Sequence, residues 1–325
     1  MKKLALVVAV LALAFGGFVV YARMGKLDSS AEEAMARYGA APSKFITIDG
    51  TRLHYRDEGS GPAIVMLHGS RANLQQWDGW VKELGGRYRT VRLDDQAHGL
   101  TGFDGKGDYS AARYQFLLSS LIDELKLEKF VLVGTSGGST SAIRYAAAHP
   151  DRVEKLVLST VPLRLPTQAN TKPWNAFVFW FHEKVLHSLG TDWYWRTFLR
   201  SIYADPDKVT DDIVTRYRIL NTQPGREPEF RNRIKLWRAS GGADRDFETA
   251  GKITMPVLIQ WGLKGPVLPK ELHCQIASAF TATQVRVISY PDLGHKLVME
   301  DPVRTARDAL QFIEQGTGGE VCAPQ

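Results

Sequence analysis

The sequence predicts an α/β fold with a mainly parallel, doubly wound sheet and a helical cap inserted before the last two strands. Short apolar runs alternate with helical patterns along most of the chain. Two of these runs, residues 63–67 and 130–133, are continuously apolar, which is typical of parallel strands buried on both faces. The alternation stops between Leu163 and Ile253, and this interruption predicts the cap.

The first predicted element, within residues 1–24, crosses or enters a membrane. Lys2 and Lys3 precede Leu4 to Tyr21, an apolar stretch of 18 residues without a charge. This is near the minimum length for a membrane-spanning helix, and the two lysines favour a cytoplasmic N-terminus. We expect a signal anchor, although a signal peptide cleaved near Ala22 is an alternative. Either one would place the globular part on the periplasmic side or outside the cell.

A polar linker over residues 25–43 leads to the predicted core, which comprises residues 44–162 and 254–315. We expect a hairpin over residues 45–55 and further strands at 63–67, 88–93, 130–133, 156–158, 257–259 and 284–289. Amphipathic or small-residue patterns predict helices at 114–125, 139–148 and 302–314. The polar residues 316–325 are expected to form a flexible tail.

The predicted cap, residues 163–253, is rich in aromatic side chains. Five of the eight tryptophans lie in it: Trp174, Trp180, Trp193, Trp195 and Trp237. A cap inserted at this point lies over the carboxyl edge of the sheet, where α/β folds bind ligands. We expect most of these side chains to attach the cap to the core, and Trp180 and Trp193 to line a substrate pocket.

Composition excludes several classes of function. The net charge of +6 is spread over alternating acidic and basic residues, and no nucleic-acid motif accompanies it. No cluster of His, Cys, Asp and Glu predicts a metal site, so we expect neither a metal nor a cofactor. An exported protein could form a Cys274–Cys322 disulfide, but two free thiols are the expectation from sequence. The oligomeric state stays open.

The strongest chemical signal is Gly134-Thr-Ser136-Gly-Gly138, placed between a buried strand and a helix. Small residues on both sides allow the sharp turn that raises a serine hydroxyl above a sheet, at the start of a helix. The N-terminus of that helix favours developing negative charge. The sequence therefore predicts that Ser136 is a nucleophile.

With this turn, the chain resembles the α/β-hydrolase family from about Phe45 to Gln315. The resemblance extends to Leu67-His-Gly-Ser70 after a strand and to Pro291-Asp-Leu-Gly-His295 after the last strand of the core. It implies that His295 is the general base. It also implies that the backbone N–H groups of Ser70 and Gly137 form an oxyanion hole.

The chain departs from this family at the acid that normally orients the histidine. The usual pattern W-G-x-x-D is here Trp261-Gly-Leu-Lys-Gly265, so Gly265 occupies the acid position. The other usual position is Ser159-Thr-Val-Pro162, again without a carboxylate. The protein could work with Ser136 and His295 alone, use an acid from elsewhere such as Asp292, or have lost catalysis.

These observations predict a serine hydrolase that cleaves an ester-like bond of a medium-sized apolar or aromatic substrate through an acyl-serine intermediate. A carbon–carbon bond hydrolase or lactonase using the same serine and histidine is an alternative. A catalytically weakened, ligand-binding pseudoenzyme is another.

Overall fold

The computed structural model describes residues 1–163, 172–265, 267–269 and 271–321. Within them the core is a nine-stranded sheet of order β1-β2-β4-β3-β5-β6-β7-β8-β9. The strands are β1 (Lys44–Ile48), β2 (Thr51–Glu58), β3 (Ala63–Leu67), β4 (Arg89–Leu93), β5 (Phe130–Thr135), β6 (Val153–Ser159), β7 (Val257–Gly262), β8 (Val285–Tyr290) and β9 (Glu320–Val321). The strands from β4 to β8 in this order pair in parallel, and the three outer pairings are antiparallel. The predicted fold class is confirmed.

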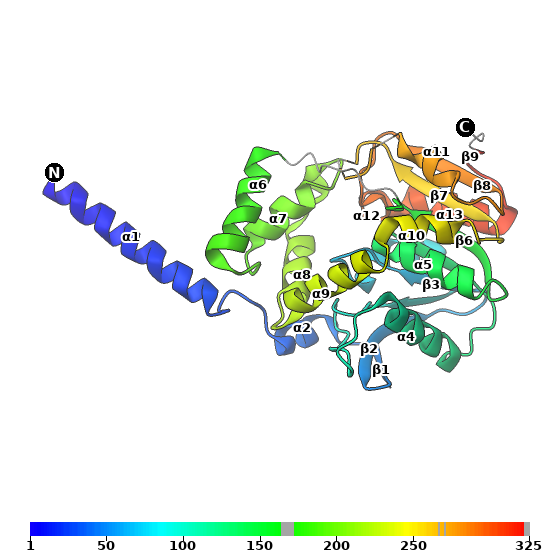
Figure 1. Cartoon of the computed structure of the whole chain (residues 1–325), viewed down its shortest axis with the longest axis horizontal. Helices are drawn as coiled ribbons and strands as arrows, with labels where there is room; N and C mark the ends of the chain where they lie inside the picture. Colours follow the sequence, from blue (N-terminus) through cyan, green and yellow to red (C-terminus); the bar gives the residue numbers. More distant parts are fainter. Residues whose placement is uncertain (164–171, 266, 270, 322–325) are drawn as a thin grey trace.

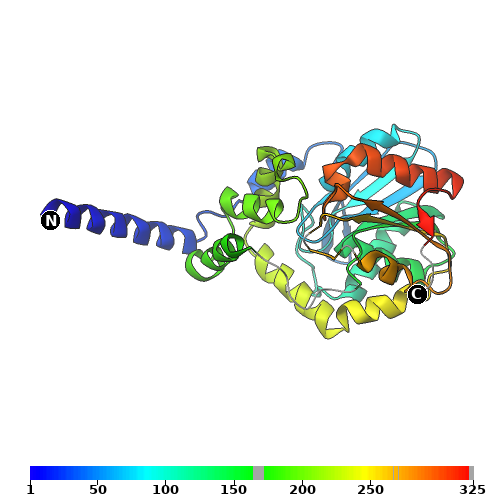
Figure 2. The ribbon, with the colours of Figure 1, turned by 90° about the horizontal axis from the view of Figure 1, so that it is seen from above.

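Helices cover both faces of this sheet (Figures 1 and 2). One face carries α4 (Ala111–Glu124), α5 (Gly137–Ala148), α10 (Gly242–Ala250) and α11 (Leu272–Ala277). The other carries η1 (Leu74–Trp77), α3 (Asp78–Leu84), α12 (Leu297–Glu300) and α13 (Pro302–Gln315). Because strand side chains alternate, Val65 and Leu67 of β3 enter the first core and Ile64 and Met66 enter the second.

The ends of these helices follow from local sequence. Ser110 caps α4 by accepting a hydrogen bond from the Arg113 N–H, and Asp301 caps α13 through the Arg304 N–H. Pro302 begins α13, where a missing N–H costs nothing. Gly316 ends it in the left-handed conformation, at φ 69°.

The cap lies between β6 and β7. It contains α6 (Pro173–Trp180), η2 (Phe181–Leu186), α7 (Asp192–Arg200), η3 (Pro206–Lys208), α8 (Asp211–Asn221), α9 (Arg226–Ala239) and, packed on the core, α10. Residues 164–171 of the predicted cap lie outside the described residues. The N-terminal helix α1 (Lys2–Arg23) projects away from the end of the molecule formed by α6 and α7 (Figure 1).

Three details differ from the sequence-based expectation. The predicted linker contains a helix, α2 (Ala31–Tyr38), capped by Ser30. The predicted flexible tail contributes β9, so three strands rather than two follow the cap. Cys274 is disulfide-bonded rather than a free thiol. Cys322, the other cysteine of the chain, lies outside the described residues.

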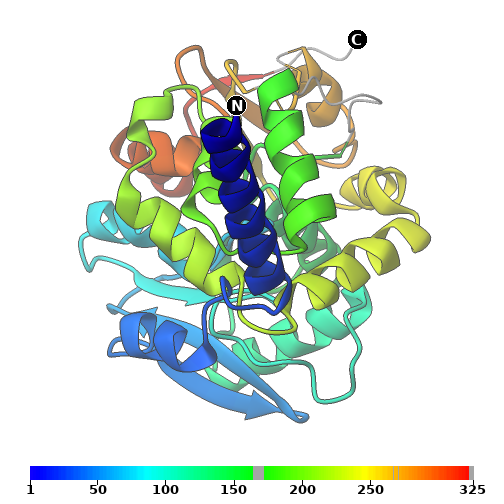
Figure 3. The same ribbon diagram turned by 90° about the vertical axis from the view of Figure 1, so that its left-hand side faces the viewer.

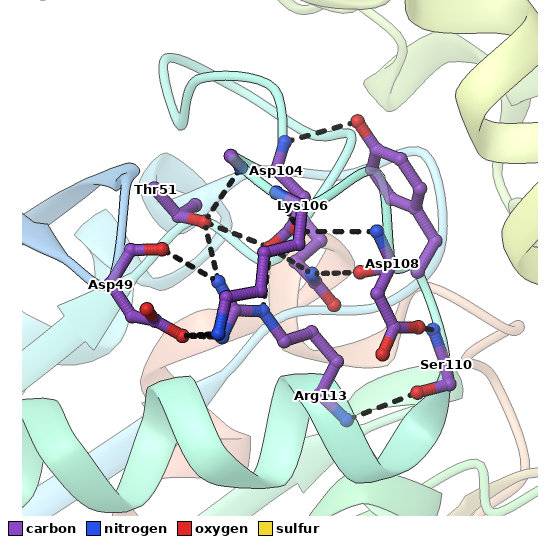
Figure 4. Close-up of polar contacts among 10 residues, drawn as sticks. Asp49, Thr51, Asp104, Lys106, Asp108, Ser110 and Arg113 are labelled. Carbon is purple, nitrogen blue, oxygen red and sulfur yellow. Dashed lines mark hydrogen bonds and ion pairs between the residues drawn. The ribbon is translucent and has the colours of Figure 1, made fainter.

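A buried ionic network fixes the loop before α4 against the β1–β2 turn (Figure 4). The Asp104 carboxylate accepts hydrogen bonds from Thr51 Oγ1 and Arg113 Nε, both at 2.8 Å. Arg113 also contacts Asp49 at 2.5 Å, and the Asp104 N–H donates to the Tyr109 hydroxyl at 3.1 Å. Burial acts to raise the pKa of Asp104, but the hydrogen bonds outweigh it and lower the pKa to about 2.

Replacing Asp104 by Asn should lower the free energy of unfolding at pH 7 by about 3 kcal/mol, because the buried Arg113 would keep its charge and lose one of its two carboxylate partners. The contribution of a carboxylate with a depressed pKa is complete above its unfolded value near 4 and is lost toward pH 2. Urea unfolding should therefore show the difference between variant and wild type shrinking below pH 4. Asp108→Asn, on the exposed side of the same loop, is the control and should change stability by less than about 0.5 kcal/mol. Equal effects of both variants would contradict a structural role for the network.

Candidate active site

Ser136 lies at the carboxyl end of β5, in the turn that begins α5. Its backbone is strained, with φ 51° and ψ −122°, and its N–H donates to Ser159 O at 2.9 Å. The turn is possible because its flanks lack side chains. A Cβ at Gly134 would come within 2.6 Å of Gly138 O, and one at Gly138 within 2.3 Å of Leu67 O. This crowding holds the Ser136 side chain above the sheet edge.

His295 comes from the loop after β8 and reaches the serine. Its Nε2 lies 3.1 Å from Ser136 Oγ, within hydrogen-bond distance. The backbone of the histidine is held on both sides: its N–H donates to Ile202 O at 3.0 Å, and its carbonyl accepts from Thr160 Oγ1 at 3.3 Å. The structure therefore brings the predicted nucleophile and the predicted base together.

The two predicted oxyanion donors also lie beside the serine. A Cβ added to Gly137 would fall 3.5 Å from Ser70 N, and one added to Gly69 would fall 3.1 Å from the Ser136 Cβ. In the described part of the chain, the N–H groups of Ser70 and Gly137 have no hydrogen-bond partner. Two unoccupied donors beside a nucleophile can bind the oxygen of a tetrahedral intermediate.

Among the residues that the structure describes, no acid contacts the side of His295 that faces away from Ser136. Nδ1 is buried and has no hydrogen-bond partner among the described residues. Gly265 lies beside this histidine, since a Cβ there would fall 3.3 Å from His295 N. Asp292, the other candidate acid, instead pairs with Arg304, with Oδ1 2.6 Å from Nη2, and its side chain is about half exposed.

This environment changes the protonation of His295. Burial, followed by the positive charge of neighbouring Lys296, lowers the pKa of His295 to about 3. Both effects disfavour the imidazolium, and no carboxylate of the described residues opposes them. The imidazole is therefore neutral and able to accept a proton above about pH 3, but it is a weak base.

A cavity of about 210 Å³ opens at this site. Its wall includes Ser70, Ser136, Gly137 and His295 from the catalytic region. The rest comes from the loop before α4, from α4, α5 and α9, and from two loops: Tyr109, Ala111, Tyr114, Gln115, Thr140, Ser141, Arg144, Pro162, Arg233, Ile234, Trp237, Val267 and Leu268.

The structure places Trp180 and Trp193 outside this cavity, which corrects the sequence-based expectation. Their side chains are 52% and 39% exposed on the outer side of the cap. Of the five cap tryptophans, Trp237 is the one that lines the cavity, and Trp195 is buried within the cap. Aromatic enrichment indicated the segment but not which face of each helix turns inward.

The cavity wall also contains two arginines that we did not assign to the site from sequence, Arg144 and Arg233, and each is paired. Arg144 Nε contacts Asp246 at 2.6 Å, and Asp246 also accepts from Trp237 Nε1 at 3.0 Å. Arg233 contacts Asp95. Arg144 Nη2 is buried without a hydrogen-bond partner among the described residues. Arg144 and Asp246 are 102 residues apart in sequence, and Arg233 and Asp95 are 138 residues apart. No local sequence motif therefore identifies these pairs.

A serine at a strained strand–helix turn, a histidine within reach and a cap over the sheet edge define an α/β-hydrolase. A family model described as serine aminopeptidase, S33, matches residues 61–302, and the chain belongs to this family of α/β-hydrolase enzymes. An uncharacterised protein of Mycobacterium tuberculosis is 34% identical over 83% of this chain and 81% of its own. A 2-hydroxy-6-oxononadienedioate/2-hydroxy-6-oxononatrienedioate hydrolase of Paraburkholderia xenovorans is 26% identical over 84% of this chain and 96% of its own.

Solved structures show the same fold. A meta-cleavage product hydrolase from Pseudomonas fluorescens superposes with a TM-score of 0.69 at 22% identity, covering 84% of this chain and 98% of that one. A bacterial membrane phospholipase A superposes with a TM-score of 0.65 at 19% identity, covering 97% of this chain and 98% of that one.

Gly265→Asp should raise kcat/KM for a simple ester at least ~10-fold, because a carboxylate there would stabilise the imidazolium of His295. It should also raise the pKa of His295, so the acid limb of the pH–rate profile moves to higher pH. Gly265 is not among the residues with positive φ, so its backbone does not exclude a side chain. The Gly265→Asn control can hydrogen-bond Nδ1–H but carries no charge, and should give a smaller gain without the pKa change. Folded variants with equal, unchanged kinetics would contradict an empty acid position.

Proposed function

We propose that the protein is a membrane-anchored serine hydrolase that cleaves an ester-like bond of a medium-sized, largely apolar substrate. Ser136 Oγ attacks the carbonyl carbon while Nε2 of neutral His295 accepts the serine proton. The N–H groups of Ser70 and Gly137 stabilise the oxyanion. The imidazolium then donates the proton to the leaving oxygen, which releases an alcohol and leaves an acyl-serine.

Hydrolysis of the acyl-serine repeats these steps with water. His295 removes a proton from the water as its oxygen attacks the acyl carbon, and returns it to Ser136 Oγ as the acid departs. The observation that carries this proposal is the 3.1 Å contact between His295 Nε2 and Ser136 Oγ, beside two N–H donors that have no partner among the described residues. That arrangement and the enzyme family favour catalysis over a role in ligand binding alone.

The charges of the cavity wall support a neutral acyl substrate. Arg144 and Arg233 each face a carboxylate, so the wall carries little excess positive charge from them. The remaining wall includes aromatic and aliphatic side chains such as Tyr114, Ile234, Trp237 and Leu268. Burial of apolar acyl atoms against them contributes about 25 cal/mol per Å².

Carbon–carbon bond hydrolysis is the second candidate, because relatives at 26% identity are named as hydrolases of 2-hydroxy-6-oxo dienedioates. One observation favours it: the buried Nη2 of Arg144 has no hydrogen-bond partner in the described residues and could receive a substrate carboxylate. The same Ser136 and His295 would serve that reaction.

Two features support export, and a contact between α1 and the cap favours a retained anchor over a cleaved signal. Helix α1 has a mean hydropathy of 2.6 and is long enough to cross a membrane. It also contacts the cap, where Arg23 Nε donates to Val185 O at 2.9 Å. The disulfide-bonded Cys274 fits an oxidising compartment.

Alkaline phosphatase fused after Gln325 should be active in cells, and an inactive fusion would contradict export.

The acyl-serine can be trapped. Full-length protein mixed with p-nitrophenyl butyrate and quenched with acid should carry one butyryl group on the peptide that contains Ser136. The same peptide of Ser136→Ala should stay unmodified, and that variant should lose turnover while keeping its fold. Turnover of a 2-hydroxy-6-oxohexa-2,4-dienoate without ester turnover would instead support the second candidate.

A further inference from the structure

An unusual group of aromatic side chains lies on the outside of the cap. Four of them, here called the aromatic face, come from α6 and α7: Trp174, Phe177, Trp180 and Trp193, with exposures of 60%, 44%, 52% and 39%. Their rings form a continuous series, with centroids 5.6 Å apart for Trp174–Phe177, 6.1 Å for Phe177–Trp180 and 6.0 Å for Trp174–Trp193. Contiguous apolar surface of this kind marks an interaction site.

The aromatic face continues onto the N-terminal helix. The Phe181 ring, next to Trp180 in sequence, stacks on Phe15 of α1 with centroids 6.3 Å apart. The Phe177 and Phe181 rings are 6.0 Å apart, which joins the series to α1. Helix α1 contacts η2, which continues α6, and Figure 1 shows that the rest of α1 projects away from the body. Figure 3 views the molecule from the end from which α1 projects.

The position of the contact along α1 sets its depth in a membrane. Phe15 lies eight residues before Arg23, the last residue of α1, which corresponds to about 12 Å along the helix axis. If the apolar stretch Leu4–Tyr21 is in lipid, Phe15 lies six residues, or about 9 Å, inside its outer end, and side chains that touch Phe15 lie among the acyl chains. Tryptophan favours the interfacial level next to the acyl chains, where its ring is in apolar surroundings and its N–H reaches water.

The surroundings of α1 favour lipid over a second protein copy as the covering of the aromatic face. None of the residues in the 18-residue apolar window of α1 is buried, so most of its length needs a covering. A bilayer covers such a helix on all sides, and it then reaches the aromatic face without any further partner.

We infer that the aromatic face docks into the interface of the bilayer that holds α1, so that the cap rests on the membrane surface. This inference rests on the proposed anchor and adds a second, separate lipid contact. It assigns all four residues of the aromatic face to lipid binding. The cap that covers the catalytic cavity would thereby be held at the membrane.

The test compares two full-length variants that each carry an NBD fluorophore on a new cysteine: Phe177→Cys on the aromatic face and Phe116→Cys on α4. Phe116 is a matched control, since it is 47% exposed and lies on a helix of the core. Because Cys274 is disulfide-bonded, it should not react with the fluorophore, and wild type is the control for background labelling. Both proteins are reconstituted in phosphatidylcholine vesicles with or without a lipid that carries a nitroxide near its headgroup.

The label at position 177 should lose most of its emission in nitroxide vesicles, and the label at 116 should lose little. Vesicle flotation separates the two parts of the proposal. Protein that floats with equally weak quenching at both positions would overturn docking alone, whereas protein that does not float would overturn both the anchor and docking. The label at 177 could instead show blue-shifted emission without quenching, and the blue shift could disappear when the protein is diluted in lipid. That result would mean that a second copy covers the aromatic face, and it would also overturn docking.

Discussion

The close approach of three backbone segments around Ser136 is the constraint on which the rest of the site depends. The end of β3, the end of β5 and the start of α5 come so near that side chains at Gly134 or Gly138 would collide with backbone atoms. The turn can then hold Ser136 at a positive φ and aim its hydroxyl above the sheet. The same approach brings the N–H groups of Ser70 and Gly137 to one side of the serine, because those residues follow β3 and begin α5.

The histidine is held differently from a histidine in a complete triad. Backbone hydrogen bonds to Ile202 and from Thr160 fix the position of His295, but nothing among the described residues accepts a hydrogen bond from Nδ1. The productive tautomer carries its proton on Nδ1, and a buried donor without a partner costs about 1–3 kcal/mol. The loss of a triad acid costs a factor of about 10⁴, or about 5 kcal/mol of transition-state stabilisation. Catalysis by the oxyanion hole and by substrate binding remains well above the uncatalysed rate.

The features that could be predicted from sequence are those that depend on residues close together in the chain. The strand patterns, the turn around Ser136, the loop that carries His295 and the glycine at position 265 each depend on a local motif whose spacing the fold preserves. The cavity wall does not depend on a local motif, because its residues come from segments that are distant in sequence. Tyr109 is placed by an ionic network around Asp104, and Arg144 and Trp237 are joined through Asp246, across helices distant in sequence.

The cap was the least predictable region for a related physical reason. Its aromatic side chains could face the core, the cavity or the outside, and no local pattern chooses among these. Helix α1 packs on Phe181 and Val185, next in sequence to the exposed Trp180. Short elements such as α2 and β9 were missed because capping and a two-residue pairing leave little pattern in the sequence.

The central claim, that Ser136 is served by a histidine without a carboxylate partner, is tested most directly by ¹⁵N NMR of full-length protein labelled at histidine. The signals of His295 are assigned by their loss in His295→Ala and followed as the pH is lowered. Burial and Lys296 predict a neutral imidazole down to about pH 4, with protonation at about pH 3. Protonation of His295 near or above pH 6.5, the ordinary value for histidine, would show that a counter-charge stabilises the imidazolium and would contradict the account.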